Sequence, residues 1–198
     1  MALSASLALI GALSGALLVS PAVAQDVAPD ALIRRVAEDV TQDKDIRAGD
    51  PAKLRALVEK KLVPHFDARR ATQIAVGVNW RRATPQQQDE LVREFTRLLV
   101  RTYSGALASY RDQTIEVMPL RAKSGDTEVT VRTRIRQPGA ESVIVEYDLA
   151  KGDSGWKVFD IRVAGISLVA TYRSTFAEEV RNHGIDGLIS TLSARNRA

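Results

Sequence analysis

Apolar residues recur at helical spacing in the first half of the chain, which we expect to be helical over residues 26–111. In PDALIRRVAEDV, one face carries Ile33, Val36 and Val40. The next series, DPAKLRALVEKKLV, opens with an aspartate and a proline, which favour the N-cap and the first position of a helix. A shorter segment, FDARRATQIAVG, is expected to end near Gly77.

A longer helix is predicted after Thr84, Pro85 and Gln87, which together form a capping box. Its apolar stripe consists of Leu91, Phe95, Leu98, Leu99, Tyr103, Leu107 and Tyr110.

The period changes to two in residues 112–164, where apolar and polar residues alternate. Four strands are predicted there, in TIEVMPL, TEVTVRTRIR, SVIVEYDLA and WKVFDIRVA. Short turns join the last three strands, which indicates an antiparallel meander. On the second strand Val131 and Thr133 lie on one face, while Arg132 and Arg134 lie on the other.

The stretch VFDIRVAGISLVATYRSTF joins these strands to the C-terminal part of the chain. Its strand pattern breaks at Gly165, and we expect helices over residues 166–195, interrupted at Gly184. The first turn, ISLVA, has almost no polar side, so it must cover more than one apolar surface. The whole pattern predicts an α+β fold, with helices gathered on one side of a curved antiparallel sheet of about four strands.

Residues 1–24 have the features of a signal peptide. They contain no charged side chain and carry an apolar run that ends in PAVA, where Ala22 and Ala24 suit a signal peptidase. A membrane anchor is the alternative, but glycine and serine interrupt the apolar run. One departure from the signal-peptide pattern is that the first residues carry no lysine or arginine. We therefore expect export, with cleavage after Ala24 and a single mature domain over residues 25–198.

Composition narrows the possible chemistry. The 198-residue chain has no cysteine, which excludes disulfides, thiolate metal sites and thiol catalysis. The net charge of +4 permits attraction to anionic partners, but the arginines are scattered singly, as on a solvated surface. The basic strand face of Arg132, Arg134 and Arg136 has no interleaved aromatic residue, so no nucleic-acid partner is expected.

Candidate catalytic groups are few. His65 and His183 both lie near predicted helix C-termini, where the helix dipole favours histidine without any catalytic role. No nucleophile elbow, phosphate loop or zinc-protease motif occurs, and neither a metal nor a cofactor is expected. Asp148 and Asp160 are candidate acids for an enzyme, although an outward carboxylate is ordinary in an alternating strand. A module that binds an apolar ligand and a plain interaction domain both remain open, because cavity-lining and core residues look alike in a sequence.

Two long blocks resemble the MlaC family, also called the toluene-tolerance auxiliary proteins. WKVFDIRVAGISLVATYRSTFAEEVRNHGIDGLISTL, residues 156–192, is similar to the C-terminal signature W-K-V-x-D-V, G-V-S-L-V and x-Y-R-x-x-F of that family. FDARRATQIAVGVNWRRATPQQQDELVREFTRLLVRTYSGAL, residues 66–107, is similar to its L-G-x-x-W-R-x-A-T-P and F-x-x-L-L-V-R-T-Y segments. The departures are Val76, where the family usually has leucine, and Ala164, where it often has glutamate.

The resemblance implies a periplasmic carrier that shuttles glycerophospholipid between the outer and inner membranes and so maintains outer-membrane lipid asymmetry. The implied partners are an outer-membrane lipoprotein complex and an inner-membrane ABC transporter with an MCE-domain subunit. The implied fold is an NTF2-like curved sheet with a helical subdomain, with the acyl tails in an apolar cavity between them and the headgroup exposed. We expect a monomer without enzymatic activity, in which phospholipid is cargo and there is no cofactor.

Residues from three regions are expected to line that cavity. They are Leu99, Tyr103, Leu107 and Tyr110 of the long helix, Val145, Tyr147, Phe159 and Ile161 of the strands, and Ile166, Val169, Tyr172 and Phe176 after them. An enzyme of NTF2-like fold and a periplasmic adaptor that binds only protein are the alternatives. The sequence leaves headgroup preference, the number of acyl chains, transport direction and the partner surfaces open.

Overall fold

The computed structural model describes residues 27–43, 50–108, 113–123 and 125–197. Its helices are α1 (Pro29–Thr41), α3 (Pro51–Lys61), α4 (Ala68–Val76), α5 (Pro85–Ala108) and α6 (Arg173–Arg197), with short 3-10 turns η1 (Val63–His65), η2 (Gly77–Arg82) and η3 (Ala170–Tyr172). Its strands are β1 (Thr114–Val117), β2 (Glu128–Arg136), β3 (Val143–Gly152), β4 (Gly155–Val163) and β5 (Ile166–Ser167). The predicted signal peptide and Tyr110 lie outside the described residues.

Side-chain caps set the starts of two helices where the sequence predicts them. The Asp50 carboxylate accepts hydrogen bonds from the backbone N–H groups of Ala52 and Lys53, at 2.8 and 3.2 Å. At the start of α5, the Gln87 amide oxygen accepts from the Thr84 N–H while the Thr84 hydroxyl accepts from the Gln87 N–H, at 3.0 and 3.2 Å. The predicted N-cap and capping box are therefore confirmed.

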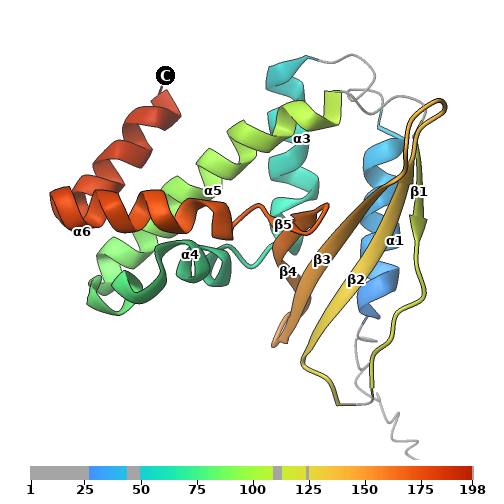
Figure 1. Cartoon of the computed structure of the whole chain (residues 1–198), viewed down its shortest axis with the longest axis horizontal. Helices are drawn as coiled ribbons and strands as arrows, with labels where there is room; N and C mark the ends of the chain where they lie inside the picture. The colour runs from blue at the N-terminus through green and yellow to red at the C-terminus, as the bar shows by residue number, and fades with distance from the viewer. Residues whose placement is uncertain (1–26, 44–49, 109–112, 124, 198) are drawn as a thin grey trace, which may run out of the picture.

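The strands form one antiparallel sheet in chain order, from β1 to β5. The register places Tyr147 of β3 between Val131 of β2 and Ile161 of β4, so the apolar alternation of three strands falls on one face. We call it the apolar face; α1 packs against it through Leu32 and Ile33 (Figure 1). The antiparallel meander is confirmed, with five strands where about four are predicted.

The connection after β4 corrects the prediction of a helix from Ile166. Ala164 and Gly165 both have positive φ, 49° and 81°, and so turn the chain back on itself. Ile166 therefore pairs with Val163 as the short strand β5. The helix begins only at Arg173, after the turn η3.

Buried apolar side chains of the described residues form three clusters. The largest lies within the helices, around Phe95 of α5 and Leu188 of α6. The second lies between α1 and the apolar face, around Val131. The third joins Val40 of α1 to Leu54 of α3. The molecule thus has a helical layer, α3 to α6, beside a sheet layer that consists of the sheet and α1 (Figure 1).

Candidate ligand-binding site

Half-buried apolar side chains line the boundary between the two layers. Leu62, at the end of α3, and Leu107, near the end of α5, pack on the third cluster. Val36 of α1, Tyr147 of β3 and Ile161 of β4 pack on the cluster of the sheet layer. We call these residues the apolar seam. Each of these side chains keeps part of its apolar surface outside the close-packed clusters.

Several of the predicted ligand-contacting residues lie in or beside this seam. Leu107, Tyr147 and Ile161 belong to it, and Val145 is the neighbour of Tyr147 on the same face, with 6% of its surface exposed. Ile166 extends the apolar face at its β5 edge, because it pairs with a β4 residue of that face. Its side chain is 62% exposed. Four of the predicted residues therefore share one face of the sheet, and the fifth, Leu107, packs on the third cluster, between α1 and α3.

The remaining predicted residues lie elsewhere. Four pack in or against the core of the helical layer: Leu99, Val169, Tyr172 and Phe176. Phe159 lies under the guanidinium of Arg70, 3.9 Å from its ring centroid. Val36 and Leu62 of the seam are not among the residues predicted from the sequence to contact a ligand. In the sequence, these two residues are marked only by their place on an apolar helix stripe. Fully buried residues occupy the same kind of position, so the stripe does not distinguish them.

Tyr103 projects from α5 toward η3, where its hydroxyl forms hydrogen bonds with the side chains of Thr171 and Tyr172. Burial is the main cause that raises the pKa of Tyr103 to about 12, and the Tyr172 hydroxyl acts in the same direction. The phenol therefore stays neutral in the folded protein at pH values where a free tyrosine ionises.

Absorbance titration is expected to show a tyrosine that ionises near pH 12 and is absent in Tyr103→Phe. The folded-state pKa lies above the ordinary value of 10.0, so the unfolded chain ionises first as the pH rises. This residue should therefore lower the free energy of unfolding progressively between those two pH values, and Tyr103→Phe should lose less stability over that window. An identical pH dependence of the variant and the parent protein would contradict this environment for Tyr103.

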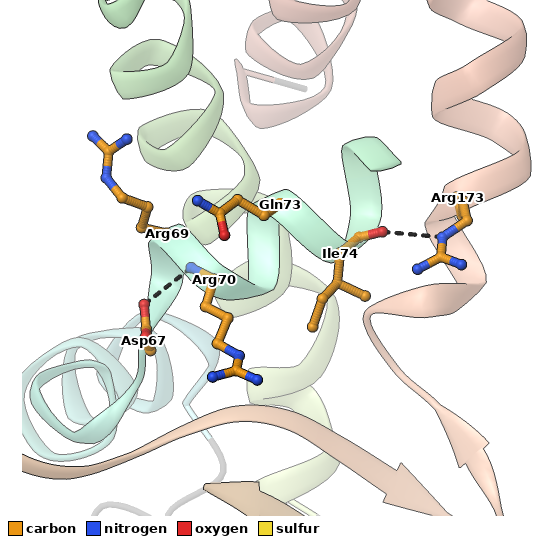
Figure 2. Close-up of a pocket in the computed structure, with 6 residues that line it drawn as sticks. All are labelled: Asp67, Arg69, Arg70, Gln73, Ile74 and Arg173. Atoms are coloured by element: carbon orange, nitrogen blue, oxygen red, sulfur yellow. Dashed lines mark hydrogen bonds between the residues drawn. The ribbon is translucent and has the colours of Figure 1, made fainter. Parts of the chain in front are cut away.

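Two open grooves lie outside the seam. The first, of about 620 Å³, runs between α4 and the start of α6 (Figure 2) and is lined by Asp67, Arg69, Arg70, Gln73, Ile74 and Arg173. The second, of about 780 Å³, lies beside β2 and includes Met118, Arg121 and Phe159. Neither is lined by a residue of the apolar seam.

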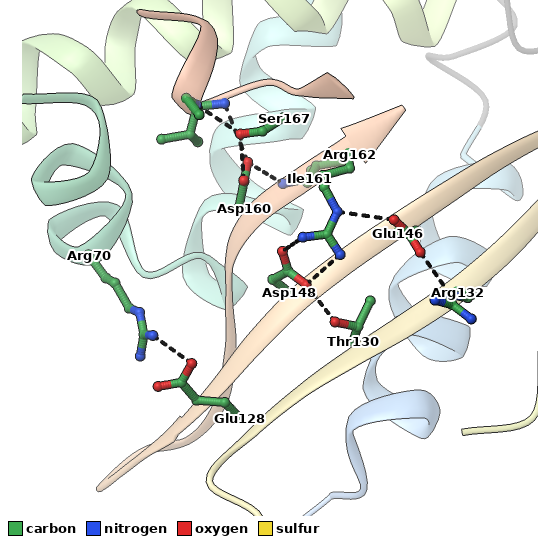
Figure 3. Close-up of polar contacts among 12 residues, drawn as sticks. Arg70, Glu128, Thr130, Arg132, Glu146, Asp148, Asp160, Ile161, Arg162 and Ser167 are labelled. Carbon is green, nitrogen blue, oxygen red and sulfur yellow. Dashed lines mark hydrogen bonds and ion pairs between the residues drawn. The ribbon is translucent and has the colours of Figure 1, made fainter. Parts of the chain in front are cut away.

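The sheet face opposite the apolar face is polar and internally paired (Figure 3). Arg162 donates from Nε to Glu146 at 3.0 Å and from Nη1 and Nη2 to Asp148 at 2.5 and 3.1 Å. Glu146 also accepts from Arg132 at 2.7 Å, and Asp148 accepts from the Thr130 hydroxyl at 2.7 Å. The hydrogen bonds from Arg132 and then Arg162 hold the pKa of Glu146 below its usual range. These charges neutralise one another across neighbouring strands.

Asp160 ties the connection after β4 to the sheet. Its carboxylate accepts hydrogen bonds from the Ser167 hydroxyl at 2.5 Å and from the N–H groups of Ile161 and Val169 at 2.8 and 3.3 Å (Figure 3). Asp148 and Asp160 are buried, with 9% and 6% exposed, although an outward position is expected for them. Both carboxylates bind groups of the fold itself, which gives the alternative of an enzyme no support.

Asp160→Ala is expected to lower the free energy of unfolding by about 3 kcal/mol, because it leaves several buried donors unpaired. Ser167→Ala is the comparison and should cost about 1.5 kcal/mol, since it leaves the carboxylate its backbone partners but removes one donor to Asp160 and the acceptor of the Ala170 N–H. Urea unfolding followed by circular dichroism measures both values. If the two substitutions were equally costly, Asp160 would not be the organising group of this turn.

The described residues contain no group of histidine, aspartate and glutamate side chains arranged to hold a metal ion. None of the described helices has the length and apolarity to cross a membrane. An α+β fold with an apolar seam between its two layers is compatible with binding of an apolar ligand.

Comparison with known proteins identifies the family. The family described as MlaC protein matches residues 30–194, so the chain belongs to the MlaC family. The Haemophilus influenzae protein named intermembrane phospholipid transport system binding protein MlaC is 23% identical over 184 residues, covering 89% of this chain and 86% of that protein. The toluene tolerance protein ttg2D of Pseudomonas putida is 28% identical over 149 residues, covering 75% of this chain and 69% of that protein.

A solved structure shares the fold. It is a phospholipid-binding protein from Ralstonia solanacearum in complex with a phospholipid, 40% identical to this chain, with a TM-score of 0.76. The match covers 85% of this chain and 96% of the Ralstonia chain. An α+β arrangement of a helical layer and an antiparallel sheet is thus found in a protein that holds a phospholipid.

Proposed function

We propose that this protein carries glycerophospholipid through the periplasm, with the acyl chains between its two layers along the apolar seam. The main support for this proposal is the phospholipid bound to the Ralstonia relative, which has the same fold. The seam supports it, because Leu107, Tyr147 and Ile161 present apolar surface that is neither fully packed nor fully exposed.

The physical role of such a carrier is to keep the acyl chains out of water. Exposing two chains of about sixteen carbons, at roughly 0.8 kcal/mol per methylene, would cost on the order of 20 kcal/mol. A seam that opens to admit the chains replaces water with apolar side chains. The headgroup can remain hydrated at the rim near Ile166, which avoids the cost of desolvating a charge.

Transport between the outer and inner membranes, and a role in outer-membrane lipid asymmetry, follow as the wider function. The Haemophilus relative is named as part of an intermembrane phospholipid transport system. We expect a monomer whose donor and acceptor are an outer-membrane lipoprotein complex and an inner-membrane ABC transporter with an MCE-domain subunit. The signal peptide would direct export and would be cleaved after Ala24.

Extraction of the purified protein with organic solvent, followed by mass spectrometry, tests the proposed cargo. The full chain is expressed in a bacterial host and purified from the periplasm, with an unrelated exported protein of the same tag as control. Glycerophospholipid should be recovered from this protein and not from the control, and the mature chain should begin at Gln25. A protein that is reproducibly empty would contradict the proposed function.

A further inference from the structure

The groove between α4 and α6, here the arginine groove, has an uneven charge. Three guanidinium groups line it, from Arg69, Arg70 and Arg173, against the single carboxylate of Asp67 (Figure 2). That carboxylate also caps α4 by accepting a hydrogen bond from the Arg70 N–H at 3.0 Å. Asp89 and Glu128 pair with Arg69 and Arg70 at the edge of the groove, so the guanidinium that remains without an ion-pair partner among the described residues is that of Arg173.

Neighbouring groups hold the arginines in place. Arg69 donates to Asp89 and lies over the Trp80 ring, 5.6 Å from its centroid. Arg70 pairs with Glu128 at 2.8 Å while its guanidinium covers the Phe159 ring. These two guanidinium groups are thus already paired within the chain, and they give the groove fixed walls beside Arg173.

Arg173 has unused donors. Its Nε donates to the Ile74 carbonyl at 3.1 Å, which fixes the side chain at the rim of the groove. Within the described part of the chain, its two terminal amino groups have no hydrogen-bond or ion-pair partner. A planar pair of N–H donors of this kind matches a carboxylate in bidentate geometry.

An exposed apolar side chain lies beside the groove. Val78 of η2 is 82% exposed, and the preceding Gly77 lies against the Arg173 side chain. Because side chains three residues apart eclipse one another in a 3-10 helix, Arg81 shares the face of Val78. Arginine beside an exposed apolar side chain is a combination that protein interfaces favour over the rest of the surface.

We infer that the arginine groove and Val78 form a docking surface for an acidic segment of a partner protein. The concave shape and the free terminal amino groups of Arg173 fit a protruding carboxylate side chain, whereas a flat membrane would meet a single exposed valine. The groove does not serve the headgroup of a lipid in the seam. Arg70 reaches Glu128, whose side chain lies on the polar sheet face, opposite the face that contributes to the seam. This surface is independent of the proposed cargo.

Photocrosslinking tests this surface. The full chain, with benzoylphenylalanine in place of Val78, is irradiated in cells of the bacterium that produces it, and the adducts are mapped by mass spectrometry. A protein adduct is expected on a segment in which aspartate and glutamate outnumber lysine and arginine. Its yield should fall about ten-fold when Arg81→Glu and Arg173→Glu are combined, and should recover when carboxylates of that segment are changed to lysine.

Arg55→Glu on the exposed surface of α3 is the matched charge reversal and should leave the yield unchanged. Adducts only with lipid, no adduct, an adduct on a basic segment, or an equal loss in Arg55→Glu would each overturn the inference. Phospholipid is extracted from the same preparations. A parent protein without lipid would contradict the proposed function alone, while the crosslinking pattern still decides the docking surface.

Discussion

Phe95→Ala is expected to lower the free energy of unfolding by about 4 kcal/mol, the largest loss of stability among the substitutions considered. The Phe95 side chain is fully buried, and its ring meets those of Tyr172 and Phe176 edge to face, with centroids 5.1 and 5.2 Å away. Its removal leaves a cavity where α5, η3 and α6 meet, in addition to the lost aromatic contacts.

Phe159→Ala is the matched control, since Phe159 is half-buried beneath an arginine at the edge of the sheet. It should cost about 1 kcal/mol. Denaturant unfolding measures both, with lipid removed beforehand so that bound cargo does not stabilise the folded state. If Phe95→Ala were no more costly than Phe159→Ala, the ring cluster would not be the core of the helical layer.

Ile161→Trp is expected to reduce bound phospholipid about ten-fold or more while the protein stays folded. The larger ring would occupy the space into which the acyl chains open the seam, and such overpacking costs about 1–3 kcal/mol. We expect this cost to fall on lipid binding and not on folding, because Ile161 is only half-buried at the boundary between the layers. Lipid per mole of protein and the thermal midpoint are measured on the same preparation.

Val143→Trp provides the comparison for this substitution. Val143 lies on the same face of the sheet but is 40% exposed near the start of β3. It should retain the parent's lipid content. A full lipid load in Ile161→Trp, or a loss of folding without any change in lipid per folded molecule, would place the cargo elsewhere.

The helix starts and the strand alternation could be predicted because they depend on nearby residues. Asp50 caps α3 and Thr84 pairs with Gln87 through side chains that reach only three residues. The start of α6 could not be predicted in this way. Ala164 takes a positive φ that is uncommon outside glycine, and Ile166 finds its partner on a neighbouring strand.

The candidate site was predictable in its chemistry and only partly in its location. An apolar excess without catalytic groups indicates a binding protein, and the two motif blocks indicate its family. Degree of burial, however, is set by tertiary packing, so Phe176 of the helical core and Ile161 of the seam look alike in the sequence. The arginine groove was also beyond prediction, because Arg69 and Arg173 come together only when α4 and α6 pack.

A phospholipid with a photoreactive diazirine near the end of one acyl chain tests the central claim most directly. The protein is loaded with this lipid, irradiated and digested, and the modified peptides are identified by mass spectrometry. Adducts are expected on the seam, at Leu107 of α5, Tyr147 of β3 and Ile161 of β4. Adducts confined to the arginine groove or to the polar sheet face around Arg162, with the seam unmodified, would contradict the account.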